Sequence, residues 1–181
     1  MRRVLDDGVV RLREADEDDV PSLERGLRDP EVARRFGRVD ATAAEVLELN
    51  RGRWRDLSGP TFAITTPDLG FAGLVWINRR ADPPTDRGAV GYWLLPEARR
   101  RGLAARAVAL ICDWAFADLR LAAVDLLTEA DNAASRAVAE VRAPVHGRAP
   151  ARHPVRRADG RVPRPRACGG VDSSGLRSSS G

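Results

Sequence analysis

The stretch Gly91-Tyr-Trp-Leu-Leu-Pro-Glu-Ala-Arg-Arg-Arg-Gly-Leu-Ala-Ala-Arg106 decides how the rest of the chain is interpreted. It begins as an apolar strand, passes through a short basic turn and opens an amphipathic helix. The first amides of a helix have no acceptor within it, and the helix dipole adds partial positive charge there. Such a helix start attracts anions, and Gly102 lets the backbone approach a ligand closely. We therefore expect an anion site at Arg99, Arg100, Arg101, Gly102, Leu103 and Ala104.

The segments on either side of this stretch predict an α/β fold. Apolar patterning and turn residues predict strands at about 9–13, 61–65, 71–77, 88–95 and 121–128. Helical spacing and capping residues predict helices at about 17–28, 43–56, 103–118 and 132–140. This order of elements is typical of a mixed sheet flanked by helices.

The composition of the chain changes after Glu140. Residues 1–140 carry 21 arginines and 24 acidic residues, a net charge of −3, whereas residues 141–181 carry nine arginines and two aspartates, a net charge of +7. From Val141 onward there is no aromatic residue, and the apolar residues follow no period of 2 or 3.6. We expect one folded domain at 1–140 and a disordered tail rich in Arg, Pro, Gly and Ser at 141–181.

Several classes of protein are disfavoured by what the sequence lacks. No apolar run is long enough to span a membrane, and the first residues lack the apolar segment of a signal peptide, which predicts a cytoplasmic protein. Cys112 and Cys168 make no disulfide framework, and no Cys/His spacing indicates a metal site. The basic tail allows at most a non-specific, salt-sensitive contact with nucleic acid.

Three motifs occur in order along the chain. They are Val10-Arg-Leu-Arg-Glu-Ala-Asp-Glu-Asp-Asp19, the segment 91–104 with Arg99-x-x-Gly102-x-Ala104, and Asp131-Asn-Ala-Ala-Ser135 followed by residues 136–140. Together they resemble the GNAT superfamily of acetyl-CoA-dependent N-acetyltransferases, and within it the RimJ/RimL-like branch. The resemblance covers roughly residues 8–140 and implies a mixed, mostly antiparallel sheet flanked by helices.

The resemblance also implies an activity. A neutral primary amine, on a protein N-terminus or a small molecule, would attack the thioester of acetyl-CoA directly, while an N–H near Leu94 polarises the carbonyl. The pantetheine arm would lie along Leu94 and Leu95, and the pyrophosphate would lie on the amides of residues 99–104. Asn132 would hydrogen-bond the arm, and Ser135 would be the catalytic residue that protonates the leaving thiolate.

Simpler interpretations stay open beside these. The basic turn at 99–104 could be a solvated helix start, and Asn132 and Ser135 could only cap a helix. The segment Arg34-Arg35-Phe36 lies where family members line the acceptor cleft, yet it could equally be a solvated helix end. Two other functions compete with catalysis: an inactive remnant that binds acetyl-CoA, and an interaction protein with a basic tail.

The end of the resemblance carries its own prediction. The family continues after the late helix with Glu-Lys/Arg-x-Gly-Phe and a two-stranded hairpin, whereas here Glu140 is followed by Val-Arg-Ala-Pro-Val-His146. The C-terminal hairpin is therefore expected to be missing, through a shifted reading frame near codons 139–141 or through a natural extension. Without the hairpin the strand at 121–128 would expose an edge and an apolar face, which predicts a poorly stable chain.

Overall fold

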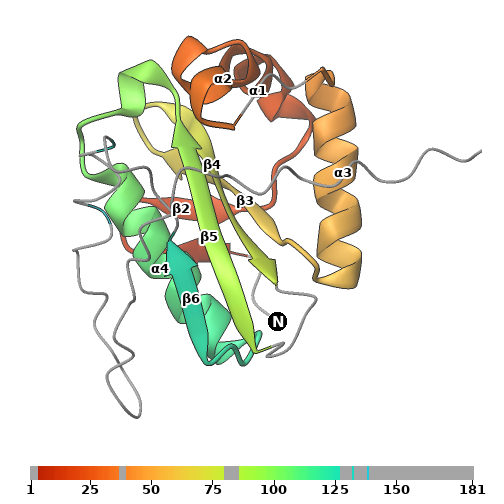
Figure 1. The fold of residues 1–181 in the computed structure, drawn as a ribbon. Helices are drawn as coiled ribbons and strands as arrows, with labels where there is room; N and C mark the ends of the chain where they lie inside the picture. The colour runs from red at the N-terminus through yellow and green to blue at the C-terminus, as the bar shows by residue number, and fades with distance from the viewer. Residues whose placement is uncertain (1–3, 37–39, 80–85, 127–131, 133–137, 139–181) are drawn as a thin grey trace, which may run out of the picture.

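The computed structural model describes residues 4–36, 40–79, 86–126, 132 and 138, and the expected late helix and tail lie largely outside them. Six strands form one sheet in sequential order (Figure 1). They are β1 (Val4–Asp6), β2 (Arg11–Arg13), β3 (Thr61–Thr66), β4 (Gly70–Arg79), β5 (Arg87–Leu94) and β6 (Ala123–Leu126). Neighbours are antiparallel except β5 and β6, which are parallel. The expected mixed, mostly antiparallel sheet is confirmed.

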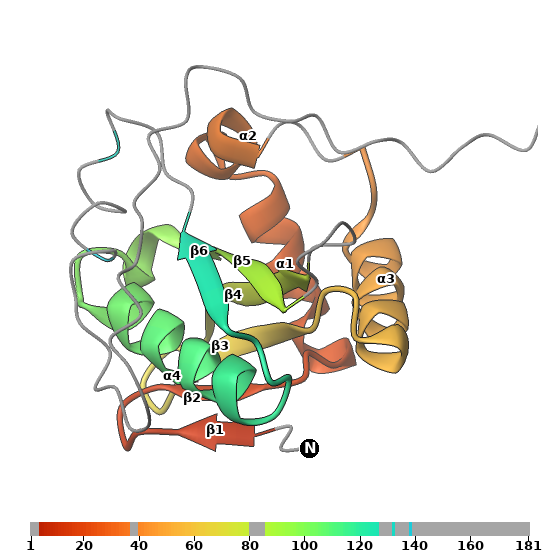
Figure 2. The same ribbon diagram turned by 60° about the horizontal axis from the view of Figure 1, so that its bottom comes forward.

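Helices cover both faces of this sheet (Figures 1 and 2). A 3-10 turn, η1 (Glu17–Asp19), leads into α1 (Val20–Leu27), α2 (Pro30–Phe36) and α3 (Ala43–Asp56). A second such turn, η2 (Pro96–Ala98), leads from β5 into α4 (Leu103–Ala117), which crosses the opposite face and returns the chain to β6. This helical crossover is what allows β5 and β6 to run parallel.

Each face of the sheet has its own apolar core. On the α4 face, Ile111 and Trp114 are fully buried. On the other face, Leu23 of α1 is fully buried and packs in a cluster with Trp93 and Leu95. Trp93 and Tyr92 therefore face opposite cores, as strand alternation predicts.

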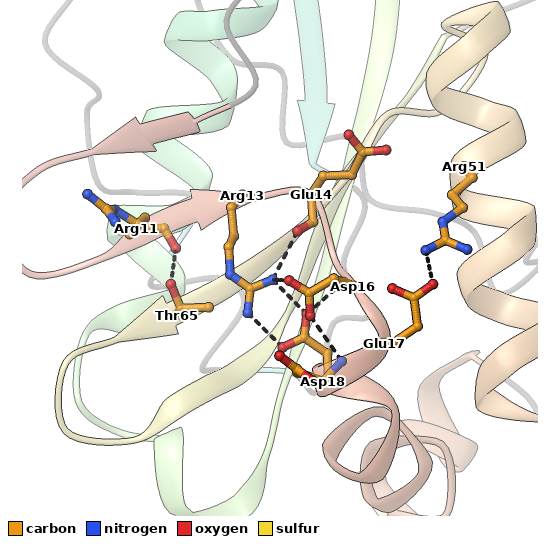
Figure 3. A network of polar contacts seen from close by, with 9 residues as sticks. Arg11, Arg13, Glu14, Asp16, Glu17, Asp18, Arg51 and Thr65 are labelled. Atoms are coloured by element: carbon orange, nitrogen blue, oxygen red, sulfur yellow. Dashed lines mark hydrogen bonds and ion pairs between the residues drawn. The ribbon is translucent and has the colours of Figure 1, made fainter.

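Capping residues fix the helix starts on the α1–α3 side. Thr42 and Glu45 form a capping box at the start of α3, in which the Thr42 hydroxyl accepts the Glu45 N–H and the Glu45 carboxylate accepts the Thr42 N–H. Asp16 caps η1, at the start of the helical segment expected from about residue 17. Arg13 on β2 points into the same turn and donates to Asp16 at 3.2 Å and to both carboxylate oxygens of buried Asp19 at 2.7 Å (Figure 3). The turn into α1 is thus tied to the sheet.

Two short elements are additions to the predicted order. β1 has three residues and pairs only with β2 among the residues described. α2 begins at the Asp29-Pro30 pair, which the sequence indicates only as the end of the preceding helix. The Asp29 Oδ1 atom accepts the N–H groups of Glu31 and Val32 at 3.0 Å each, so Asp29 is an N-cap and Pro30 starts the next helix.

Candidate active site

The two edges of β5 have different neighbours. β4 pairs with it from Gly88 to Leu94, whereas β6 pairs only with Arg87 to Val90. Figure 1 shows β6 beside the first part of β5 only. Among the described parts of the chain, no strand lies along Gly91–Leu94 on the β6 side. The last residues of β5, Gly91–Leu94, therefore have an open backbone edge on that side.

The backbone of Leu94 faces this open edge. The Leu95 N–H donates to the Ala72 carbonyl of β4 at 2.9 Å, and consecutive residues of a strand direct their backbone groups to opposite edges. The Leu94 carbonyl accordingly points away from β4, where it accepts a hydrogen bond from Arg99 Nε at 3.0 Å. The side chains of Leu94 and Leu95 are buried in the two cores. A ligand at this edge would meet backbone groups.

A bulge in β4 shapes the end of β5. The register places Ile64 opposite Gly73 and Thr65 opposite Phe71, so Ala72 is the extra residue. Gly73 has φ +156°, and a Cβ there would lie 2.1 Å from the Trp93 carbonyl oxygen. Only glycine permits so close an approach of the two strands. The sequence shows this glycine but not the contact that requires it.

The start of α4 has the geometry of an anion site. Gly102 precedes the helix in the left-handed region, with φ +74°, and the space beside it is open. The Arg106 N–H donates to the Gly102 carbonyl at 3.3 Å. The amides of Leu103, Ala104 and Ala105 come before that bond and have no acceptor within the helix. These features fit the pyrophosphate of a cofactor such as acetyl-CoA.

The arginine side chains of the turn differ from one another. Arg99 is three-quarters buried and donates to Asp29 at 2.6 Å, while Arg101 is more exposed and donates to Asp68 at 2.7 Å. Burial alone would raise the pKa of Asp29, but hydrogen bonds from Arg99 and from the α2 amides bring it below its usual value. The sequence does not distinguish these two arginines, because their carboxylate partners lie in distant loops.

The acceptor-side expectation falls on the end of α2. Phe36 is exposed, and its ring meets the edge of Trp76 with centroids 5.4 Å apart. Trp76 in turn lies over Gly91, where a Cβ would be 2.4 Å from its ring. The end of α2 is thus connected through two aromatic rings to the first residue of the open edge. Asn132 is half-buried, and Ser135 lies outside the described residues.

Metal and thiol chemistry have little support in the described part of the chain. There, no group of three His, Cys, Asp or Glu residues is placed to hold a metal ion. No helix in these same ranges is long and apolar enough to cross a membrane. Burial raises the pKa of the Cys112 thiol to about 12, so this cysteine is neutral near pH 7 and is unsuited to act as a nucleophile.

A family model described as the acetyltransferase (GNAT) domain matches residues 10–141. The chain belongs to the GNAT acetyltransferases. Acetyl-CoA is the cosubstrate of this family, and the resemblance inferred from the three motifs is confirmed. No curated protein matches the chain.

Solved structures share the fold. RimJ from Mycobacterium smegmatis, in complex with CoA-disulfide, is 23% identical with a TM-score of 0.63, covering 75% of this chain and 69% of that one. A spermidine N-acetyltransferase from Vibrio cholerae, with CoA and spermine, is 16% identical with a TM-score of 0.63, covering 73% and 78%. A ribosomal-protein-S5-alanine acetyltransferase from Vibrio fischeri is 18% identical with a TM-score of 0.63, covering 75% and 79%. At these identities the likeness concerns the fold.

Proposed function

We propose that the protein transfers an acetyl group from acetyl-CoA to a primary amine. The observation that carries this proposal is the continuity between the open edge of β5 at Gly91–Leu94 and the free amides at the start of α4. An extended amide-bearing arm can pair with a strand edge as another strand would, and a pyrophosphate suits a helix N-terminus. The two features follow each other along one chain segment, in the order that acetyl-CoA requires.

Each residue of the site has a proposed role. The open edge of β5 at Leu94 would pair with the pantetheine arm, and Asn132 would hydrogen-bond the arm. Both backbone groups of Leu95 already have partners in the chain, the Ala72 carbonyl and the Ala98 N–H, so Leu95 would border the arm without pairing with it. The amides between Arg99 and Ala104 would bind the pyrophosphate, and the side chains of Arg100 and Arg101 would add positive charge nearby. Bound acetyl-CoA would supply the thioester carbon that the amine attacks.

Two groups of the protein are proposed to act in the acetyl transfer itself. The Leu94 N–H would stabilise the charge that develops on the thioester oxygen, and Ser135 would give a proton to the leaving thiolate. The amine must reach the site neutral and lose a proton as the new amide forms. Asp29 is unsuited to accept this proton, because its lowered pKa makes it a weak base.

The acceptor is proposed to be a protein N-terminus or a small amine. The names of two structural neighbours give one example of each, the S5-alanine enzyme and the spermidine enzyme. The ring surface of Phe36 and Trp76 lies beside the open edge and would form part of the acceptor side. Residues 37–39, which follow Phe36 in the sequence, lie outside the described residues.

Calorimetry with acetyl-CoA and a thiol-release assay test the proposal together. Suitable acceptors are spermidine and short peptides with a free N-terminal alanine or serine. Binding with turnover supports the proposed activity. Binding without turnover on the whole panel would favour the inactive remnant, and no binding at all would favour an interaction protein with a basic tail.

A further inference from the structure

The Arg99 side chain joins three elements of the site. Its Nε donates to the Leu94 carbonyl at the end of β5, at 3.0 Å. One terminal nitrogen donates to the Asp29 Oδ1 at 2.6 Å, and the other lies 3.1 Å from a Glu31 carboxylate oxygen. Asp29 caps α2 and Glu31 lies in its first turn. One guanidinium thus connects the open strand edge, the basic turn before α4 and the start of α2.

These contacts use three of the five guanidinium N–H groups and leave one on each terminal nitrogen for a phosphate. Each of its three nitrogens already has an oxygen partner, two of them from carboxylates. The Asp29 side chain is 9% exposed, so its bond to Arg99 is shielded from water and strengthened by the lower local dielectric. Arg101, by contrast, pairs with the half-exposed carboxylate of Asp68, which water and an incoming anion can readily replace.

The Leu94–Leu95 peptide is consequently held from both sides. Its N–H is bonded to the Ala72 carbonyl of β4, and its C=O is bonded to Arg99. A peptide held in this way keeps a fixed orientation, and so does the neighbouring Leu94 N–H. At the other end of the guanidinium, the α2 cap is held in place, and α2 carries Phe36 toward Trp76.

We propose that Arg99 is a positioning residue that fixes the open edge of β5 and the start of α2 relative to each other. This inference rests on the proposed acetyltransferase function, because it assigns Arg99 to the alignment of the donor side with the acceptor side. The backbone amide of Arg99 keeps its proposed place beside the pyrophosphate, while the side chain serves geometry instead of phosphate binding. Loss of these contacts should misplace the acceptor more than it weakens the binding of acetyl-CoA.

Three substitutions separate the contacts. Arg99→Gln places an amide nitrogen near the former Nε, which keeps a donor for Leu94 but does not reach Asp29. Arg99→Met removes both contacts. Asp29→Ser keeps a side-chain cap for α2 but is too short to reach Arg99. Arg101→Gln is the reference, because it removes the same charge from the same turn without altering β5 or α2.

Two measurements give the decisive comparison. Calorimetry measures the affinity for acetyl-CoA, and steady-state kinetics measures kcat/KM for the best acceptor of the peptide and spermidine panel. We expect Arg99→Met to lower kcat/KM for the acceptor roughly tenfold or more relative to Arg101→Gln, since small misplacements of reacting groups have effects of this size. Its Kd for acetyl-CoA should stay within about threefold of that of Arg101→Gln, as both lose one charge. Arg99→Gln and Asp29→Ser should each lower kcat/KM for the acceptor by a similar, smaller factor. Because both break the same contact, the double variant should have about the same kcat/KM as either single variant.

A second readout does not depend on turnover. Hydrogen exchange should be faster at the Glu31 and Val32 amides in Arg99→Met than in Arg101→Gln, because their acceptor Asp29 loses its partner. Arg99→Met could instead weaken acetyl-CoA binding far more than Arg101→Gln does, while acceptor kcat/KM and hydrogen exchange in α2 stay unchanged. That result would make Arg99 a phosphate ligand and would overturn the inference. Failure of the unsubstituted protein to bind acetyl-CoA would instead overturn the proposed function.

Discussion

At the scale of single residues, Gly73 is the position where the site tolerates least change. A Cβ there would lie 2.1 Å from the Trp93 carbonyl oxygen and 2.9 Å from the Leu94 Cα, both of them backbone atoms that cannot turn aside. We expect Gly73→Ala to lower the free energy of unfolding by about 3 kcal/mol or more, measured by urea titration. Gly70→Ala is the matched control, because Gly70 also has positive φ but open space, and about 1 kcal/mol is expected there. Equal losses would contradict a tight approach at Gly73.

Cys112 gives a second prediction at this scale. The thiol is buried in the α4 core and its pKa is raised to about 12, so thiolate is scarce at any ordinary pH. In a Cys168→Ser background, a thiol reagent at pH 8 should label the native protein at least about a hundredfold more slowly than the urea-unfolded protein. Rapid labelling under native conditions would show that α4 opens readily.

At the scale of elements, the attachment of β2 to α1 should carry considerable stability. Asp19 is 4% exposed and accepts two hydrogen bonds from Arg13, whose pKa is raised chiefly by this contact. Asp19→Ala would leave the Arg13 charge partly buried without its main partner, and we expect a loss of about 2 kcal/mol in unfolding free energy. Glu17→Ala removes the exposed pair with Arg51, which water screens, and should have a much smaller effect on the unfolding free energy. A comparable loss from Glu17→Ala would refute the ranking.

The elements also show how far the sequence predicts the fold. α3 and the strands β3, β4 and β5 were predicted to within a few residues, because caps, turns and apolar periodicity are local signals. β1 and α2 were missed, since a strand of three residues has no period and a Pro that ends one helix can start the next. For the site, the motif predicts the free amides of α4, which any helix start has. Asp29, one carboxylate partner of Arg99, lies 70 residues away in the sequence, and only the folded chain brings the two side chains together.

At the scale of the whole molecule, acidic pH should unfold the protein. The pKa values of Asp29, of Asp68 beside Arg101 and of Glu97 are all lowered in the fold. Each such carboxylate stabilises the fold fully above its unfolded pKa, near 3.8 for Asp and 4.5 for Glu, and loses that contribution as pH falls through the folded value. We expect Tm to be nearly constant from pH 7 to 5 and to fall progressively below about pH 4.5. A Tm that rises on acidification would contradict these shifts.

The C-terminal part of the molecule calls for a test at the level of the gene. β6 is the last strand of the described sheet, and the family match ends at residue 141, where the composition changes. We propose that a small insertion or deletion near codons 139–141 shifts the frame and replaces the family's final hairpin. Resequencing should find it, and an intact open frame around codon 140 would refute the proposal in favour of a natural extension.

The repaired chain then separates cofactor binding from catalysis. Its Tm should exceed that of the present chain, because a restored hairpin would cover the edge and apolar face of β6. Acetyl-CoA at about 100 times its Kd should stabilise each form by about 2.7 kcal/mol, since the edge of β5 and the start of α4 are common to both. Turnover, which needs both halves of the cleft, should be far greater in the repaired form. If acetyl-CoA stabilises only the repaired chain, the donor half depends on the hairpin and does not form a binding site alone.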